Sequence, residues 1–311
     1  MVDWDCVQGG PDESSCCDDI ECYPNLVMGN NISIKDKFER RTLMPLPEVK
    51  KYIPNKTPVT NTHNIFDLKI LLEGDSGSGK THLCATYHLG PIHFYMFDKG
   101  GIVTVKKLMK NRPTCSPITY DDFSDKDMPF SKCWDQIVLD EKEGLFQYLA
   151  ENNGIVVCDS ITSANVKAIK EIARLDNRTP PAPGKVVMAK KKFEFVHWDQ
   201  LASWIGGLIE GMQSTPCASI CTVHLTEHTN DDGAVIARKP SVNGKLQNLI
   251  SINYDEVYNV VETNGKYVTH FKDFKMVKAG TRAFSCKKIE DLNLTMLAKA
   301  YLNGDLLEKM I

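Results

Sequence analysis

The segment Gly74-Asp75-Ser76-Gly77-Ser78-Gly79-Lys80-Thr81 matches the pattern G-x-x-x-x-G-K-[ST] and constrains the fold more than any other stretch of the chain. The apolar run 68–73 before it predicts a buried strand, and residues 80–88 after it predict a helix. Three glycines let the backbone curl so that successive N–H groups point inward at a phosphate. The spacing therefore predicts a phosphate-binding loop between a strand and a helix.

Two side chains of this loop have predicted chemical roles. Lys80 is expected to place its ammonium between the β- and γ-phosphates of a nucleotide, and Thr81 to hold Mg²⁺ through its hydroxyl. The expected cofactors are therefore ATP and Mg²⁺. The alternative, a flexible Gly/Ser turn, leaves the adjoining Lys-Thr pair unexplained. The expected nucleotide-binding residues are Gly74, Asp75, Ser76, Gly77, Ser78, Gly79, Lys80 and Thr81.

The composition of the 311 residues is that of an ordinary intracellular protein, with a formal net charge of −3. No apolar run approaches the roughly 20 residues that cross a bilayer, and the N-terminus lacks the basic and apolar regions of a signal peptide. We therefore expect a cytoplasmic protein without a membrane segment. The net charge neither requires nor excludes a nucleic-acid partner.

The first 65 residues differ in composition from the rest. Residues 1–34 carry acidic side chains but no Lys or Arg, and residues 42–66 contain four prolines. We expect an acidic, Cys-containing tail and Pro-rich linker over 1–65, a core over 66–285, and a C-terminal helical segment over 286–311.

The cysteines fall into two groups. Cys6, Cys16, Cys17 and Cys22 lie in the acidic tail without C-x-x-C spacing, which leaves open a zinc site or a disordered tail. Cys84, Cys158, Cys217 and Cys221 lie in apolar segments and are expected to be buried, reduced thiols.

From residue 66 onward, apolar strands and helical stretches alternate. This pattern predicts an α/β fold, a mostly parallel sheet flanked by helices, with an antiparallel C-terminal hairpin at Thr263-Asn264-Gly265. Residues 103–131 remain unassigned. The predicted strands are 68–73, 92–98, 154–159, 217–224, 255–262 and 266–272, and the predicted helices are 80–88, 142–152, 164–176, 197–213 and 289–302.

The run 154–160 supplies the second half of the predicted nucleotide site. It is an apolar strand that ends in Asp159, whose carboxylate is expected to hold the Mg²⁺ together with Thr81. The next residue is Ser160, where an AAA+ motor usually carries a Glu base. This argues against a standard AAA+ enzyme. The alternative is a buried strand that ends at an exposed Asp.

The order of these motifs resembles a phage family of RecA-like P-loop ATPases, AAA-type nucleotide-binding proteins related to single-strand annealing and recombination ATPases. The resemblance covers about residues 66–285. It implies a RecA-like core and an ATPase that acts on single-stranded DNA in recombination, annealing or replication, in the host cytoplasm. The motifs that carry it are the phosphate loop, Phe97-Asp98-Lys99-Gly100-Gly101, Val156-Val157-Cys158-Asp159-Ser160, Thr222-Val223-His224, residues 239–245, and Lys278 with Arg282.

The resemblance also implies a set of catalytic residues. The family usually has Glu immediately before the Gly-Gly pair, where this chain has Lys99, so Asp98 becomes the expected base and turnover is expected to be slow. His224 matches a γ-phosphate sensor, with a structural His as the alternative. The implied catalytic residues are Lys80, Asp98, Asp159, His224, Lys278 and Arg282.

Lys278 and Arg282 resemble residues that reach a neighbouring subunit's γ-phosphate. That role implies a homo-oligomer, either a ring or a filament. The alternative is a solvated basic turn.

Two basic loops are the expected contacts to DNA, with solvated surfaces as the alternative. Trp198 and Trp204 are spaced as core residues of a helix, and base stacking by either is the minor reading. The predicted nucleic-acid contacts are Lys190, Lys191, Lys192, Arg238, Lys239 and Lys245, with Lys185 in the first of the two loops.

Three other functions share some of these sequence features. A nucleotide-gated assembly protein without DNA binding is favoured by Lys99 and the small net charge. A small-molecule kinase requires a lid with convergent Arg residues, and no clear lid is visible. The pattern H-x-x-E-H at 224–228 occurs in some zinc proteases, but a predicted strand cannot present both His residues on one helical turn.

Overall fold

The computed structural model describes residues 65–110, 112, 116–176, 193–243, 245–274 and 276–303. All of them belong to one compact unit, Lys56–Ile311, and the other unit, Met1–Asn55, lies outside the described residues. Several predicted sites therefore also lie outside them: Cys6, Cys16, Cys17, Cys22, Lys185, Lys190, Lys191 and Lys192.

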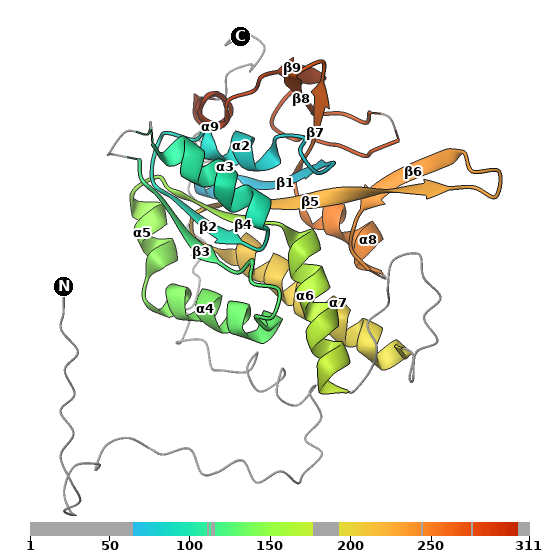
Figure 1. Ribbon diagram of the computed structural model, residues 1–311. Coiled ribbons are helices and arrows are strands. Elements are labelled where there is room, and N and C mark those ends of the chain that lie inside the picture. Colours follow the sequence, from blue (N-terminus) through green and yellow to red (C-terminus); the bar gives the residue numbers. More distant parts are fainter. Residues whose placement is uncertain are drawn as a thin grey trace, which may run out of the picture. The chain divides into compact units, whose positions relative to one another are not determined.

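A nine-stranded sheet forms the centre of the fold (Figure 1). The strands follow the order β3–β2–β4–β5–β1–β7–β8–β9, and β6 pairs with the outer part of β5. The first six strands in this order are parallel, whereas β8, β9 and β6 are antiparallel to their neighbours. The strands are β1 (Lys69–Gly74), β2 (Ile92–Met96), β3 (Ile118–Asp122), β4 (Ile155–Asp159), β5 (Ala218–Thr229), β6 (Val235–Pro240), β7 (Glu256–Thr263), β8 (Lys266–His270) and β9 (Lys288–Glu290).

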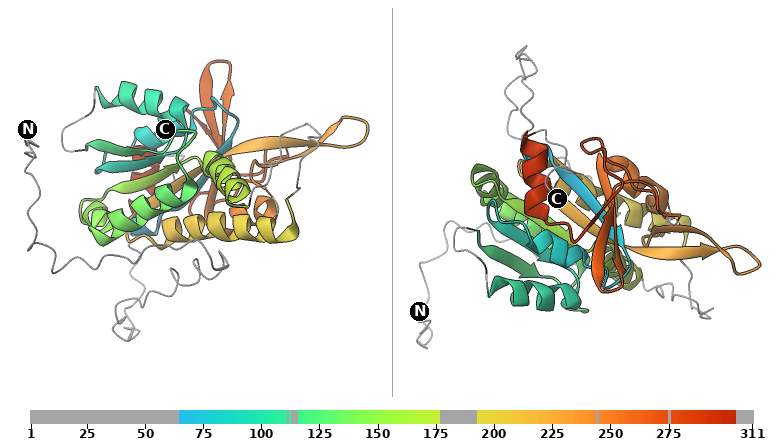
Figure 2. Two further views of the ribbon diagram at one scale, coloured as in Figure 1. Left: turned by 60° about the horizontal axis from the view of Figure 1, so that its bottom comes forward. Right: turned by 90° about the horizontal axis from the view of Figure 1, so that it is seen from above.

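Helices cover both faces of the sheet (Figures 1 and 2). Helices α2, α3 and α9 lie on one face, and α4, α6 and α7 lie on the other. No helix within the described ranges is long and apolar enough to span a membrane. The helices are α2 (Lys80–Ala85), α3 (Lys99–Met109), α4 (Phe130–Lys142), α5 (Leu145–Glu151), α6 (Ile161–Leu175), α7 (Phe195–Ser214), α8 (Leu246–Leu249) and α9 (Leu294–Asn303), with short 3-10 turns η1 (Ile65–Asp67) and η2 (Ile250–Asn253).

The central strands are buried because they are covered on both sides. Ile70, Leu71 and Leu72 of β1 are fully buried, and so are Val156 and Val157 of β4. Parallel strands covered on both faces are expected to be continuous apolar runs of this kind. The burial of apolar surface therefore fixes these strands in the middle of the sheet.

Two helices begin at side chains that cap them next to the sheet. The Ser160 hydroxyl accepts a hydrogen bond from the backbone N–H of Ser163 at 3.2 Å, at the start of α6. The Asp98 carboxylate accepts one from Gly100 N–H at 3.0 Å, at the start of α3. Such caps satisfy backbone donors that the first helical turn leaves free. Both helices therefore start at the carboxyl end of a strand.

The carboxyl ends of the parallel strands β1, β2, β4 and β5 lie at the same end of the sheet. In the register of the pairing, Gly74 of β1 lies opposite His224 of β5, and Met96 of β2 lies opposite Asp159 of β4. Ligands of open parallel sheets bind at this edge. The topology therefore gathers the predicted loop, the predicted carboxylates and His224 in one place.

The predicted fold class is confirmed, while several elements differ from the prediction. The six predicted strands are present, but the prediction does not include β3, β6 and β9 or the helices α3, α4 and α8. The helix predicted over 289–302 begins only at Leu294, because Lys288–Glu290 form β9 along the edge of the sheet. How the chain divides at residues 66 and 285 stays a prediction.

The β5–β6 hairpin extends outward from the sheet (Figure 1). Strand β5 runs to Thr229, beyond the predicted end at residue 224, and β6 returns antiparallel to it. Most side chains along the outer part of the hairpin are not buried. The sequence therefore lacks the burial pattern that would have predicted this extension.

Candidate functional site

The predicted phosphate loop connects β1 to α2 at the carboxyl edge of the sheet. Gly79 adopts a φ of 93°, in the left-handed region that favours glycine. A Cβ at this position would also lie 2.6 Å from the ring of Tyr267 on β8. The last glycine of the loop is therefore required both by its backbone conformation and by an aromatic ring packed against it.

The Lys80 side chain lies across the loop and is buried. Its ammonium donates hydrogen bonds to the carbonyl oxygens of Gly74 and Asp75, each at 2.8 Å. Burial lowers the pKa of Lys80 to about 8, and the negative charge of Asp159 opposes that shift. At neutral pH the group remains a cation, which is the form that binds a phosphate.

Asp159 and Thr81 are in direct contact. The Thr81 hydroxyl donates to Asp159 Oδ2 at 2.6 Å, and the Thr222 hydroxyl of β5 donates to Asp159 Oδ1. Asp159 is buried. Mg²⁺ prefers a few oxygen ligands of this type and keeps several waters. A hydroxyl and a carboxylate oxygen held together beside the loop fit that ion, so the two residues predicted to hold a metal lie where a shared ion would require them.

Asp98 lies at the start of α3, facing the same site. Burial lowers the pKa of Lys80, and burial together with the Lys80 charge lowers the pKa of His224. The negative charge of Asp98 opposes both of these shifts. Gly101 packs so closely that a Cβ there would lie 2.8 Å from Asp159 Oδ2. Lys99, by contrast, is exposed on α3. The turn thus brings the Asp98 carboxylate toward the phosphate loop.

His224 lies beside Lys80, as the register of β1 and β5 requires. His224 Nδ1 is 3.5 Å from Lys80 Nζ, and the backbone N–H of His224 donates to the Thr162 hydroxyl at 3.0 Å. Burial, followed by the Lys80 charge, lowers the pKa of His224. The imidazole is therefore neutral at pH 7, with Nδ1 able to accept from the ammonium.

Arg238 of β6 is ion-paired, which the sequence did not predict. Its guanidinium contacts the Asp75 carboxylate of the phosphate loop, and its Nε lies 3.5 Å from Glu227 Oε1. The hydrogen bond and charge of Asp75 raise the pKa of Arg238. A residue predicted to contact DNA thus links the hairpin to the phosphate loop.

The other basic residues that the sequence predicts to be functional, within the described ranges, are exposed or half-buried. Lys278 is exposed, and Arg282 pairs with Asp255 at 2.6 Å in an exposed ion pair. Lys239 donates to Asn248 Oδ1 at 3.1 Å. The Lys245 ammonium lies 5.7 Å from the centroid of the Phe195 ring.

Several secondary predictions are also settled by position. The described cysteines are buried and free of disulfides, as expected for Cys84, Cys158, Cys217 and Cys221. Trp204 is buried and stacks on Phe130 at a centroid distance of 5.7 Å, which confirms it as a core residue. The H-x-x-E-H pattern lies within strand β5, so it does not form the helical turn of a zinc protease.

One further group within the described residues could hold a metal ion. Ligand atoms of His93, Asp121 and Asp140 lie within 4.8 Å of one another at the β2–β3 side of the sheet. These groups already have protein partners, since Asp140 accepts from Tyr95 at 2.8 Å and His93 Nδ1 contacts the Thr119 hydroxyl at 2.9 Å. The three groups therefore belong to a hydrogen-bond network that includes Tyr95 and Thr119.

The phosphate loop with its lysine follows β1, and the buried Asp159 ends β4, which is separated from β1 by β5 alone. This arrangement defines a P-loop nucleoside triphosphatase. A family model described as an AAA domain matches residues 67–283, more than half of the chain. The chain belongs to this AAA domain family of P-loop ATPases. The predicted P-loop ATPase relationship is thereby confirmed, and the narrower relation to phage recombination ATPases stays a prediction.

Solved ATPases also resemble the chain, at low similarity. One is a prototypical ATPase from the type III secretion system of pathogenic bacteria, with 14% identity and a TM-score of 0.39, covering 65% of this chain and 55% of that one. Another is the assembled ATPase EscN with its central stalk EscO from enteropathogenic E. coli, with 11% identity and a TM-score of 0.38, covering 65% and 45%. The chain spans about half the length of these proteins. A search of curated proteins finds no match.

Proposed function

We propose that this protein binds MgATP in the loop Gly74 to Thr81 and hydrolyses it to ADP and phosphate. The observation that carries the proposal is the hydrogen bond between Thr81 and Asp159, next to the Lys80 ammonium. These three groups supply a hydroxyl, a carboxylate and a cation around one loop of backbone N–H donors. That combination matches the parts that bind and activate a nucleoside triphosphate.

The residues divide the chemical work as follows. Lys80 neutralises the β- and γ-phosphates, and Thr81 with Asp159 would hold the ion. Bound Mg²⁺ would neutralise charge that develops on the phosphate oxygens. Asp98 accepts the proton of the attacking water, and neutral His224 contacts Lys80 and responds to the γ-phosphate. Lys99 is exposed on α3 and has no role in this chemistry.

The active unit that we propose is a homo-oligomer, a ring or a filament. Lys278 is exposed, and the Arg282 ion pair with Asp255 is exposed on both sides. An exposed ion pair of this kind contributes little to stability. An anionic group at a neighbouring subunit can therefore take the place of Asp255 as the partner of Arg282. A cation supplied this way would couple hydrolysis to assembly.

We further propose that the oligomer acts on single-stranded DNA in recombination, annealing or replication. The supporting feature is Lys245 over the exposed ring of Phe195, because a cation beside an aromatic face suits a phosphate beside a stacked base. Lys239 on the hairpin adds positive charge nearby in sequence. Arg238 contributes less than the sequence predicts, since Asp75 and Glu227 already neutralise it.

A nucleotide-gated assembly protein that does not bind DNA is the second candidate. It is favoured by exposed apolar side chains, namely Ile236 on the hairpin at 58% exposure and Ile252 on η2 at 73%. A small-molecule kinase has less support. Within the described residues, the stretch 103–131 comprises most of α3, strand β3, the connection 123–129 and the start of α4, with no separate lid.

Oligonucleotide binding separates the two candidates. Binding of a fluorescent single-stranded oligonucleotide is measured with and without MgATP over a range of salt concentrations, using wild type and a Phe195→Ala, Lys245→Ala variant. The DNA proposal predicts affinity that falls steeply with salt and that the variant weakens. Absence of binding at low salt would refute it and favour the assembly protein.

A further inference from the structure

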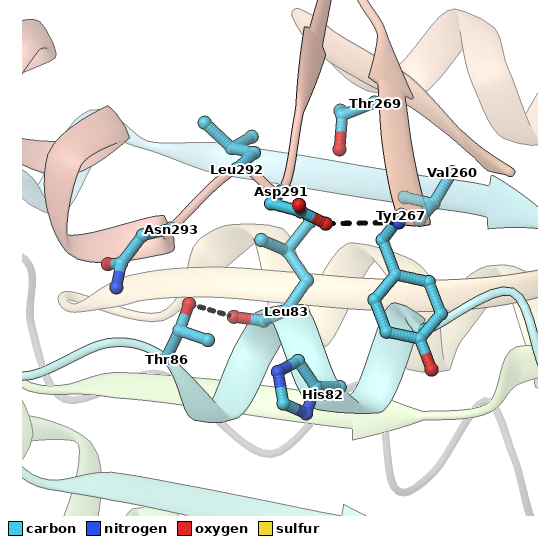
Figure 3. A pocket seen from close by; sticks show the side chains of 10 residues that line it. His82, Leu83, Thr86, Val260, Tyr267, Thr269, Asp291, Leu292 and Asn293 are labelled. Carbon is cyan, nitrogen blue, oxygen red and sulfur yellow. Dashed lines mark hydrogen bonds between the residues drawn. The ribbon is translucent and has the colours of Figure 1, made fainter. Parts of the chain in front are cut away.

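A cavity of about 220 Å³ opens beside the phosphate loop (Figure 3). Gly79, the last glycine of the loop, lines it, so the cavity adjoins the place where a triphosphate would bind. Its walls come from α2, from the β7–β8 hairpin and from the segment between β9 and α9. The lining residues are Gly79, His82, Leu83, Thr86, Val260, Tyr267, Thr269, Asp291, Leu292 and Asn293.

The chemistry of the walls suits a flat, uncharged group. No Lys or Arg is among the described residues that line the cavity, whereas Leu83, Val260 and Leu292 supply apolar surface. A phosphate would therefore lack a positively charged partner there. The volume is below the roughly 300–1,000 Å³ of pockets that hold drug-sized ligands. A single heterocyclic base is the part of a nucleotide that this space fits.

Two rings form one aromatic wall of the cavity. The centroids of His82 and Tyr267 are 5.8 Å apart, with an interplanar angle of 33°. Aromatic rings in direct contact have centroids about 4.5–7 Å apart, so these two rings pack against each other. The rings are therefore too close to enclose a base, and instead offer a surface on which it can stack.

Two polar side chains also line the cavity: in Figure 3, Asp291 lies beside the backbone of Tyr267, and Asn293 lies on the side away from that ring. Asn293 Oδ1 accepts a hydrogen bond from Thr295 N–H at 2.8 Å. This bond fixes the orientation of the amide and leaves its Nδ2 group available to donate to a ligand. Asp291 Oδ1 accepts from Tyr267 N–H at 3.2 Å, which ties this loop to the strand that carries the ring. An amide donor and a carboxylate acceptor match the ring nitrogen and exocyclic amine at the edge of a purine.

We propose that this cavity binds the purine base of the nucleotide, stacked on the wall formed by Tyr267 and His82. The proposal rests on the proposed function, because it assigns the base of the same ATP whose phosphates occupy the loop. It gives the β7–β8 hairpin a role in nucleotide recognition. It also accounts for the contact between Tyr267 and Gly79, which places the base wall directly against the phosphate site.

The test compares ligands with and without a base. Calorimetric titration measures the affinities of MgATP, MgGTP, MgUTP and magnesium tripolyphosphate for wild type, Tyr267→Ala and Tyr267→Phe. Tyr148→Ala is the matched control, because Tyr148 is half exposed on α5 and does not line this cavity. Thermal melting establishes that each variant is folded.

The base pocket predicts that wild type prefers the two purine nucleotides over MgUTP and tripolyphosphate. Tyr267→Ala should weaken the affinity for MgATP about 5- to 100-fold, which is the range for the loss of one base–aromatic stack. The affinity for tripolyphosphate should be unchanged. Tyr267→Phe should bind like wild type, because stacking needs the ring and not the hydroxyl.

Two outcomes would overturn the base pocket. One is unchanged MgATP affinity in Tyr267→Ala, and the other is an equal loss for MgATP and tripolyphosphate, which would show that Tyr267 only supports the loop. A wild-type protein that binds none of the four ligands would instead refute the phosphate site itself. The failure of each proposal is therefore distinguishable.

Discussion

Arg238 of the projecting hairpin forms an ion pair with Asp75 in the phosphate loop. Glu227, opposite Arg238 in the β5–β6 register, provides a second carboxylate. Asp75 would bring a negative charge close to a bound triphosphate, and Arg238 neutralises it. The hairpin thus takes part in the electrostatics of the nucleotide site.

This pair predicts a charge-dependent effect on nucleotide affinity. Arg238→Ala should weaken MgATP binding about 3- to 10-fold, because an uncompensated carboxylate a few ångströms from a phosphate costs about 1 kcal/mol or more. Asp75→Asn in the same chain should restore the affinity, since it removes the repelling charge. Calorimetric titration of both variants checks this, and a double variant as weak as the single one would contradict it.

Asp159 predicts a specific loss of the Mg²⁺ effect. Asp159→Asn should reduce hydrolysis about 100-fold or more and abolish the gain in ATP affinity that Mg²⁺ gives the wild type. Asp122→Asn is the matched control, because Asp122 also ends a parallel strand but is exposed and bonded to Ser124. ATP titrations with Mg²⁺ and with EDTA give the readout. A Mg²⁺ effect that persists in Asp159→Asn would show that the ion is held elsewhere.

Asp98 and Lys99 predict opposite outcomes at adjacent positions. Asp98→Asn should slow hydrolysis about 100-fold with little change in ATP affinity, as expected for loss of a general base. Lys99→Ala should leave the rate unchanged, because Lys99 is exposed. Single-turnover hydrolysis separates the chemical step from binding. If Asp98→Asn hydrolyses at the wild-type rate, another group activates the water.

Glu73 predicts a pH-dependent stability. Burial raises its pKa from 4.5 to about 7, opposed by a hydrogen bond from Ser251. The folded chain therefore holds a proton that the unfolded chain releases between pH 4.5 and 7, so the contribution of this residue to stability is lost as the pH rises through that window. By the same linkage the loss amounts to roughly 3 kcal/mol at pH 8.5.

Glu73→Gln removes this titration and tests it. The variant should match wild type near pH 4.5 and be more stable than wild type at pH 8.5. Urea unfolding at the two pH values measures the difference in free energy of unfolding. A difference that is the same at both would contradict the assignment of the shift to Glu73.

The sequence predicted the features that arise from local pattern. The phosphate loop, the apolar strand ending in Asp159 and the alternation of strands and helices sufficed for the fold class. The same patterns point to Thr81 and Asp159 as metal ligands, a role that stays a prediction. Helix α3 was missed because Gly100 and Gly101 interrupt its first turn, where glycine disfavours a helix. The small size of Gly101 is required, because a Cβ there would lie 2.8 Å from Asp159 Oδ2.

Contacts between distant segments explain the remaining differences. The ion pair of Arg238 with Asp75 spans 163 positions in the sequence, and neither residue carries a local sign of it. Tyr267 reaches the loop only because β7 lies beside β1 and β8 folds back along it. From sequence alone, a basic residue on a polar strand is predicted to be a surface cation. Only the topology of the fold shows which carboxylate it pairs with.

The most direct measurement of the central claim is steady-state phosphate release from MgATP by wild type and by Lys80→Ala at low salt. Thermal melting of both proteins shows whether the variant retains the fold. The account predicts turnover by wild type and none above background in Lys80→Ala, because the buried ammonium that neutralises the phosphates is gone. Equal rates in the two folded proteins would contradict the assignment of ATP hydrolysis to this loop.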